Sequence, residues 1–121
     1  MAHEGLHEEE RDLSEKTREM RRALVSLQEE LEAVDWYRQR ADACGDAQLK
    51  AVLLHNMRDE MEHAAMLIEW LRRNDDDFEG QLRALVFTDG DIVEIEAKTA
   101  EPPPAEDDRR PTIGALKERS T

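Results

Sequence analysis

Two long stretches of helical periodicity, separated by a short turn at Gly45, constrain this chain most. Within residues 20–41 and 49–71, apolar side chains recur every three or four positions, which is the spacing of one helix face. Neither Gly nor Pro interrupts either stretch. A connection this short joins its helices as an antiparallel hairpin. We therefore predict an all-α fold built on two helices, each about 40 Å long.

Capping residues predict where the two helices begin and end. Ser14 is a good N-cap for the first helix, and Gly45 can supply a left-handed residue at its C-terminal end. Asp46 is a plausible N-cap for the second helix, which should end at the polar residues 74–77.

Residues 78–97 have a weaker pattern. Apolar positions in residues 78–86 predict a short helix, and residues 88–91 are polar and contain Gly90. Residues 92–96 fit either a further turn or two of helix or a short strand, and we favour helix because nothing else in the chain would pair with a strand. The expected fold is thus an antiparallel two-helix hairpin plus a short C-terminal helix.

Three polar residues occupy positions that the pattern reserves for apolar side chains. Glu30 lies in the apolar stripe of the first helix, and Glu60 and His63 lie in that of the second. A buried carboxylate without a partner is costly, so each needs a cation or a hydrogen-bonding group. Glu30 and Glu60 are each fifteen residues from Gly45. Both should therefore lie about 22 Å from the turn, level across the hairpin.

These three residues match half of a di-iron site. Side chains at i and i+3 point the same way on a helix, so Glu60 and His63 can bind one metal ion. Carboxylate-bridged di-iron bundles take a Glu from each of two helices and a Glu-x-x-His pair from each of two others. A two-fold dimer would bury the apolar face in a four-helix bundle and double the ligands to four Glu and two His. Carboxylate and imidazole ligands suit Fe(II).

The same residues also have a simpler interpretation. Glu-rich helices produce Glu-x-x-His by chance, with Glu60 in a surface ion pair and His63 half-buried in the core. The level position of Glu30 on an apolar stripe is the observation that favours a metal site over this alternative.

Charge and composition exclude some functions. The formal net charge of −13 disfavours nucleic acid and anionic membranes as partners, suits the attraction of cations, and is also explained by solvated helix faces alone. With one cysteine, Cys44, no intrachain disulfide can form, which fits a reducing compartment. No apolar run approaches the ~20 residues of a membrane span, and no secretory signal is evident. We expect a cytoplasmic protein.

The chain divides by composition into four segments. Residues 1–13 are polar and predicted to be a flexible N-terminus, and residues 14–97 form the helical domain. Residues 98–111 are a charged, proline-rich linker. Residues 112–121 are partly apolar and suit a docking peptide that orders on a partner, the alternative being a disordered tail.

At this point the sequence resembles a known family, the encapsulated ferritins. The resemblance covers about residues 14–96 and is carried by residues 24–37 (LVSLQEELEAVDWY), 55–66 (HNMRDEMEHAAM) and 69–73 (EWLRR). The segment EELEAVDWY is the most specific part. Residues 112–117 (TIGALK) resemble the cargo-loading peptide that docks inside an encapsulin shell, with Ala115 where Ser is common.

The resemblance implies a function and an assembly. Members are two-helix subunits whose ferroxidase site forms only between two chains, and whose dimers assemble into a decameric ring. The ring oxidises Fe(II) but encloses no storage cavity, so iron is stored in the surrounding encapsulin nanocompartment. The implied partners are further copies of this chain and an encapsulin shell protein contacted through residues 112–119.

The resemblance also implies roles for single residues. Glu30, Glu60 and His63 would be the ligands of the catalytic di-iron centre, with Tyr37 beside them. Glu29, Glu32 and Trp36 would form an outer acidic site where metal enters, with calcium as a further candidate ion there. Two other functions use the same helices: a metal buffer with negligible turnover, and a metal-free structural hairpin.

Overall fold

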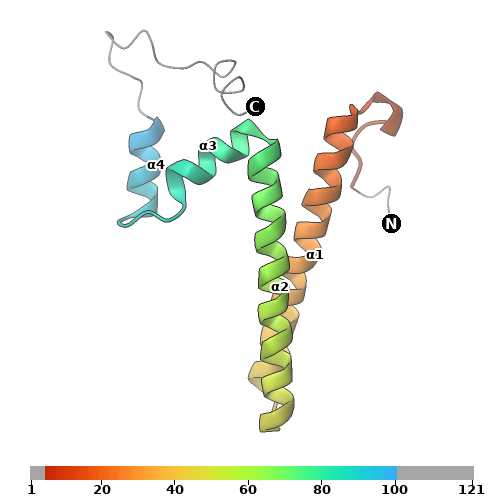
Figure 1. The fold of residues 1–121 in the computed structure, drawn as a ribbon, viewed down its shortest axis with the longest axis vertical. Coiled ribbons are helices and arrows are strands. Elements are labelled where there is room, and N and C mark those ends of the chain that lie inside the picture. Colours follow the sequence, from red (N-terminus) through yellow and green to blue (C-terminus); the bar gives the residue numbers. More distant parts are fainter. Residues whose placement is uncertain (1–4, 101–121) are drawn as a thin grey trace. The chain divides into compact units, whose positions relative to one another are not determined.

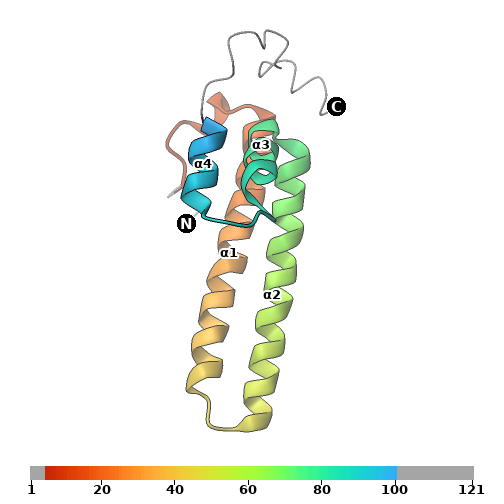
Figure 2. The ribbon, with the colours of Figure 1, turned by 90° about the vertical axis from the view of Figure 1, so that its left-hand side faces the viewer.

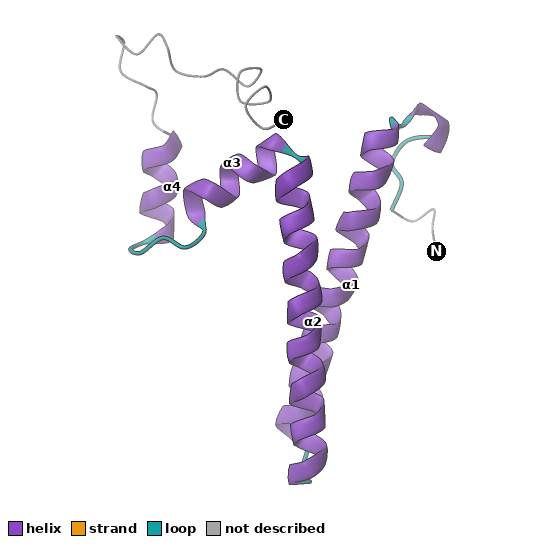
Figure 3. Ribbon diagram, in the orientation of Figure 1, coloured by secondary structure: helices purple, strands orange, loops and turns teal. Residues whose placement is uncertain are grey.

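The computed structural model describes residues 5–100, and every regular element in that range is helical (Figure 3). The elements are a 3₁₀ turn, η1 (Glu10–Asp12), and four α-helices, α1 (Glu15–Ala43), α2 (Ala47–Asn74), α3 (Asp76–Leu85) and α4 (Ile92–Ala100). They form two compact units whose boundary lies between Trp70 and Leu71. The predicted all-α class is confirmed. Within residues 5–100, no helix is both long and apolar enough to cross a bilayer.

Helices α1 and α2 form the predicted hairpin and run antiparallel, side by side (Figures 1 and 2). The backbone N–H of Thr17 donates to Ser14 Oγ at 3.1 Å, which caps α1. The backbone N–H of Leu49 donates to Asp46 Oδ2 at 3.1 Å and satisfies one of the free amides at the start of α2. Both predicted N-caps are therefore confirmed.

The turn between α1 and α2 differs from the prediction at Gly45. Helix α1 ends at Ala43. The backbone of its C-cap, Cys44, is extended (φ −80°, ψ 124°), and the Cys44 N–H donates to the carbonyl oxygen of Ala41 at 3.2 Å. Among the described residues, left-handed backbone occurs at Phe87 and Gly90 and not at Gly45. The prediction of a left-handed Gly45 was wrong, because the chain leaves α1 through an extended residue and Asp46 then starts α2.

The hairpin has a small core. Its buried apolar side chains are Ala23, Ala41, Met57 and Ala64, and the three alanines permit close approach of the helices. Larger apolar side chains stay accessible, for example Leu31, which is 52% exposed, and Met66, which is 58% exposed. Further exposed apolar side chains on α1 and α2 are Trp36, Leu49, Val52, Met61, Ile68 and Trp70. One hairpin therefore leaves much of its apolar surface facing outward.

The second unit contains the end of α2, α3 and α4. Asp75 caps α3 by accepting from the N–H of Phe78 at 3.2 Å. Glu79 on α3 forms ion pairs with two arginines. Its Oε1 lies 3.2 Å from Arg72 Nη1 and 2.7 Å from Arg83 Nε. Helix α3 is thus tied to the last turn of α2 by an ion pair as well as by the chain.

Two short helices follow the hairpin, where the sequence predicted one. Gly90 has a φ of 104°, and Asp91 accepts from the N–H of Glu94 at 3.0 Å, so the polar residues 88–91 end one helix and begin another. The preference for helix over strand in residues 92–96 is confirmed. Helix α4 continues to Ala100, so residues 98–100 of the predicted linker are helical.

The segment before α1 is bonded to that helix. The guanidinium of Arg18 donates to the carbonyl oxygen of Glu10 at 2.7 Å, and that of Arg21 donates to the carbonyl oxygen of Gly5 at 3.1 Å. The predicted docking peptide at residues 112–119 lies outside the described residues. The four-segment division of the chain stays a prediction.

Replacing Asp46 with Ala should destabilise the hairpin at its turn. The substitution removes the side-chain acceptor for the Leu49 N–H, and loss of such a cap costs about 1 kcal/mol of unfolding free energy. Urea denaturation followed by circular dichroism, on metal-free protein at one fixed concentration, measures this loss. Asp46→Asn keeps an acceptor and should stay within a few tenths of a kcal/mol of the parent. An equal loss in both variants would contradict the capping role.

Candidate metal centre

Three potential metal ligands converge between α1 and α2. His63 Nδ1 lies 3.5 Å from Glu30 Oε2 and 3.4 Å from Glu60 Oε2. One ligand atom from each of the three residues lies within 4.8 Å of the other two. The register expected from the distances to Gly45 therefore brings Glu30 level with Glu60 and His63.

Local helix geometry explains the convergence. Glu60 and His63 are i and i+3 on α2, so their side chains share a face, and Glu30 reaches them from α1. The side chains of Glu30 and Glu60 are 25% and 23% exposed, and that of His63 is 46% exposed. The cluster is partly sheltered by the hairpin and open on one side, so an ion and further ligands can reach it.

The donor atoms fit one divalent metal ion. Metal–ligand bonds of about 2.1 Å place neighbouring donors about 3 Å apart and opposite donors about 4.2 Å apart in an octahedron. The separations of 3.4 and 3.5 Å, and the outer limit of 4.8 Å, need only small side-chain movements to match this. Two carboxylates and an imidazole are a donor set suited to Fe(II) and other first-row divalent ions.

The pKa values of the two carboxyl groups shift in opposite directions. Hydrogen bonding to Glu60, together with partial burial and the charge of Glu60, raises the pKa of Glu30 above its ordinary value. The same bond lowers the pKa of Glu60. When Glu30 is protonated, its proton offsets the repulsion between the two carboxyl groups, as a bound cation would.

The histidine is also shifted. Partial burial by itself lowers the pKa of His63, but the hydrogen bond to Glu60 and the negative charges of Glu30 and Glu60 outweigh it. The pKa of His63 therefore lies above its ordinary value of 6.5. Any proton on these side chains competes with a cation for the same donor atoms.

The other predicted site residues also lie on α1 and are not part of the cluster of three. Glu29 and Glu32 are exposed, one position before and two positions after Glu30, so they point off its face. Trp36 is 49% exposed. Tyr37 is part-buried, and the guanidinium carbon of Arg40 lies 5.5 Å from its ring centre. Nothing in this arrangement supports calcium at the outer residues.

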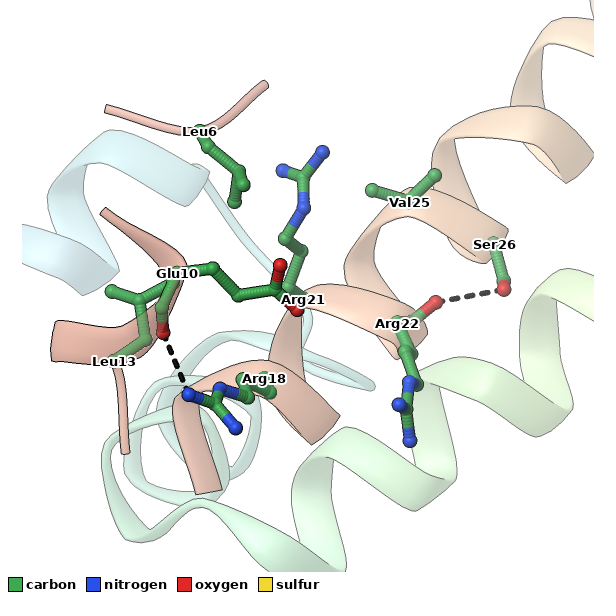
Figure 4. Close-up of a pocket in the computed structure, with 8 residues that line it drawn as sticks. All are labelled: Leu6, Glu10, Leu13, Arg18, Arg21, Arg22, Val25 and Ser26. Atoms are coloured by element: carbon green, nitrogen blue, oxygen red, sulfur yellow. Dashed lines mark hydrogen bonds between the residues drawn. The ribbon is translucent and has the colours of Figure 1, made fainter. Parts of the chain in front are cut away.

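Three arginines near the start of α1 were not predicted as site residues. Arg18, Arg21 and Arg22 line a hollow beside the N-terminal segment, together with Glu10 (Figure 4). The available signal was their spacing of three and four residues, on one helical turn, in a chain whose net charge is −13.

Metal binding to the cluster should weaken as pH falls. The raised pKa of His63 means that its protonated form persists to higher pH than usual, so binding is favoured above that pKa and is lost as pH falls through it. Below the pKa, each displaced proton should reduce the apparent affinity by roughly tenfold per pH unit. Calorimetric titration with Co(II), in buffers of different ionisation enthalpy, measures both the affinity and the proton release.

His63→Ala is the matched variant for this titration. It should bind Co(II) more weakly and lose the pH dependence near neutrality. An affinity that does not change with pH in the parent protein would rule out His63 as a ligand.

Comparison with known proteins places this arrangement in a family. The EncFtn-like family model matches residues 5–89. An encapsulated ferritin-like protein of Rhodospirillum rubrum is 55% identical over 91 residues, covering 75% of this chain and 65% of that protein. A ferritin-like protein of Thermotoga maritima is 50% identical over 94 residues, covering 78% of this chain and 82% of that protein.

A more distant relative and a solved structure extend the comparison. An encapsulin nanocompartment cargo protein of Myxococcus xanthus is 32% identical over 104 residues, covering 77% of this chain and 80% of that protein. The crystal structure of a Nitrosomonas europaea protein superposes with a TM-score of 0.69 at 53% identity, covering 73% of this chain and 97% of that one. The helical hairpin with its Glu30, Glu60 and His63 cluster therefore belongs to the EncFtn-like family.

Proposed function

We propose that this protein is a ferroxidase, which oxidises Fe(II) with O₂ at a di-iron site shared by two copies of the chain. The observation that carries the proposal is the cluster of Glu30, Glu60 and His63, which is one half of the ligand set of a carboxylate-bridged di-iron bundle. Membership of the EncFtn-like family supports the same reading.

A second copy would complete the site. A two-fold dimer places the same patch of both subunits in contact, so a cluster on that patch is doubled. The result would be four carboxylates and two imidazoles around two irons. The exposed apolar side chains on α1 and α2, such as Leu31 and Met66, supply surface that a dimer could bury.

The chain's own residues would bind and position the substrate. Binding of Fe(II) would compete with any proton on Glu30 and His63, whose pKa values are both raised, and would use the carboxylates and the imidazole as ligands. Two Fe(II) ions held side by side can each give an electron to O₂. The carboxylates stabilise the increase in positive charge on the metals, and the helices fix the spacing of the ligands.

Acidic residues outside the cluster would supply it with iron. Glu29 and Glu32 are exposed on α1, near Trp36, and a net charge of −13 raises the concentration of cations near the surface. We assign these three residues to metal entry and Tyr37 to support of the ligands, roles that the family resemblance suggests.

The relatives suggest where the protein acts. One is named an encapsulated ferritin-like protein and another an encapsulin nanocompartment cargo protein. We propose that this chain is likewise cargo, a homo-oligomer that residues 112–119 dock to an encapsulin shell in the cytoplasm, where iron would be stored. A ring of five dimers is the assembly that the resemblance favours. Because the chain spans 65% of the Rhodospirillum rubrum relative, these properties are proposals for this chain.

Oxygen uptake after addition of Fe(II) to the purified, metal-free protein tests the activity. Glu30→Ala and His63→Ala should each reduce uptake to the rate of Fe(II) in buffer, because each removes a ligand from both halves of the site. A Glu29→Ala, Glu32→Ala double variant should slow the initial rate at low Fe(II) and leave the final amount oxidised unchanged.

Glu62→Ala is the matched control for this assay, since it removes an exposed carboxylate two residues from Glu60 and should keep the parent rate. Parent uptake no faster than that of iron in buffer would exclude a ferroxidase. If iron still bound, the protein would be a metal buffer, and if it did not, a structural hairpin. Loss of uptake with an unchanged dissociation constant in His63→Ala would argue against His63 as a ligand.

Removal of residues 112–121 should prevent loading into the encapsulin shell without changing Fe(II) oxidation. The shortened chain retains all three ligands and should oxidise Fe(II) at the parent rate, but it should no longer copurify with a co-expressed encapsulin shell. Fusion of residues 101–121 to an unrelated fluorescent protein is the converse control and should cause that protein to be packaged. Packaging of the shortened chain at the parent level would show that another surface docks to the shell.

A further inference from the structure

The connection between α3 and α4 presents an apolar surface to solvent. Phe87 is fully exposed, at 103%, and Ile92 and Val93 at the start of α4 are 68% and 73% exposed. Val86, at the end of α3, is 42% exposed. We call these four residues the connector patch. An apolar cluster of this kind on a highly charged chain is typical of a surface that a further segment or molecule covers.

The backbone at the centre of the connector patch is strained. Phe87 has a φ of 61°, which is unfavourable for a bulky L-residue and which glycine would adopt without cost. The turn is held by bonds on both sides: Thr88 Oγ1 donates to the carbonyl oxygen of Leu85 at 2.9 Å, and Asp91 caps α4. Such strain points to a requirement for the aromatic ring at this position.

Acidic residues surround the connector patch. Asp89 and Asp91 lie in the connection, and Glu94 and Glu96 occupy exposed positions of α4. With Lys98 as their one basic residue, residues 86–98 carry a net charge of −3. A surface that covers the patch must therefore combine apolar side chains with positive charge.

The end of the same chain has this composition. Residues 109–119 (RRPTIGALKER) contain four basic residues and one acidic residue, a net charge of +3 in a chain whose total is −13. Ile113 and Leu116 are their large apolar residues. We call residues 109–119 the basic tail, and they lie outside the described part of the chain. Residues 101–108, in contrast, contain four acidic residues and no basic one, so they do not complement the connector patch.

The chain is long enough to bring the basic tail back to the connector patch. Helix α4 has nine residues, so the patch lies about 13 Å back from Ala100 along the helix axis. Residues 101–108 span about 25 Å when extended, at roughly 3.1 Å per residue for a proline-rich segment. A tether of this length also gives a high effective concentration, so a contact too weak to join separate molecules is populated within one chain.

We propose that the basic tail covers the connector patch of its own chain, with Ile113 and Leu116 against Phe87 and with the basic side chains facing the acidic residues around the patch. The contact is intramolecular and does not depend on metal. Its consequence for docking rests on the proposed function: residues 112–119 cannot cover the patch and bind an encapsulin shell at once, so the shell must displace them. Any other surface that covers the patch would likewise release the tail.

A photo-crosslink from position 87 tests the contact in the full-length, metal-free protein. p-Benzoyl-phenylalanine in place of Phe87 keeps an aromatic ring there, and irradiation should join it to residues 109–119, identified by mass spectrometry after proteolysis. In an excess of ¹⁵N-labelled parent protein, the cross-linked tail should remain unlabelled, because it belongs to the same chain. The matched control places the same group at Leu49, an exposed apolar residue of α2, and should give little of this product.

Charge reversal tests the electrostatic part of the contact. Arg109→Glu combined with Arg110→Glu should lower the cross-link yield about threefold or more, as should about 1 M salt, where charges are screened beyond about 3 Å. Reversing Glu94 and Glu96 to Arg in the same chain should recover about half of the loss, which general destabilisation cannot imitate. Glu106→Gln, in the acidic linker, should not lower the yield.

Three results would overturn the proposal: no cross-link between position 87 and residues 109–119, a cross-linked tail that carries the ¹⁵N label and therefore comes from another copy, or charge reversals that do not compensate each other. Oxygen uptake and shell packaging enter none of these measurements. The proposal can therefore fail while the ferroxidase and the cargo role stand, and the reverse also holds.

Discussion

The carboxyl groups of Glu30 and Glu60 are the constraint on which the rest of this structure depends. They come together from α1 and α2, on helix faces that are otherwise mainly apolar, and His63 lies within 3.5 Å of both. Two carboxyl groups this close are stable when one carries a proton or when both bind a cation. In the absence of both, their negative charges repel. The residues between α1 and α2 therefore favour the binding of a positive charge.

The small core follows from the same arrangement. Alanines and one methionine are buried between α1 and α2, while Leu31, Trp36 and Met66 remain accessible. The isolated hairpin buries little apolar surface for two helices of this length. Its metal cluster is also open on one side. The proposed dimer would bury the exposed apolar side chains and complete the metal ligands through the same contact, because two-fold symmetry brings together the same face of both subunits.

The sequence by itself determined the helices, their caps at Ser14 and Asp46, and the level placement of Glu30 and Glu60, because periodicity and the rise per residue are local properties of the chain. It did not determine the backbone of the turn, where an extended Cys44 made a left-handed Gly45 unnecessary, or the separate existence of α4. Only the tertiary structure showed that His63 meets both carboxylates, that Phe87 is held exposed in a strained conformation, and that three arginines line one hollow. These depend on side-chain directions and on contacts between distant segments, which spacing along one helix does not specify.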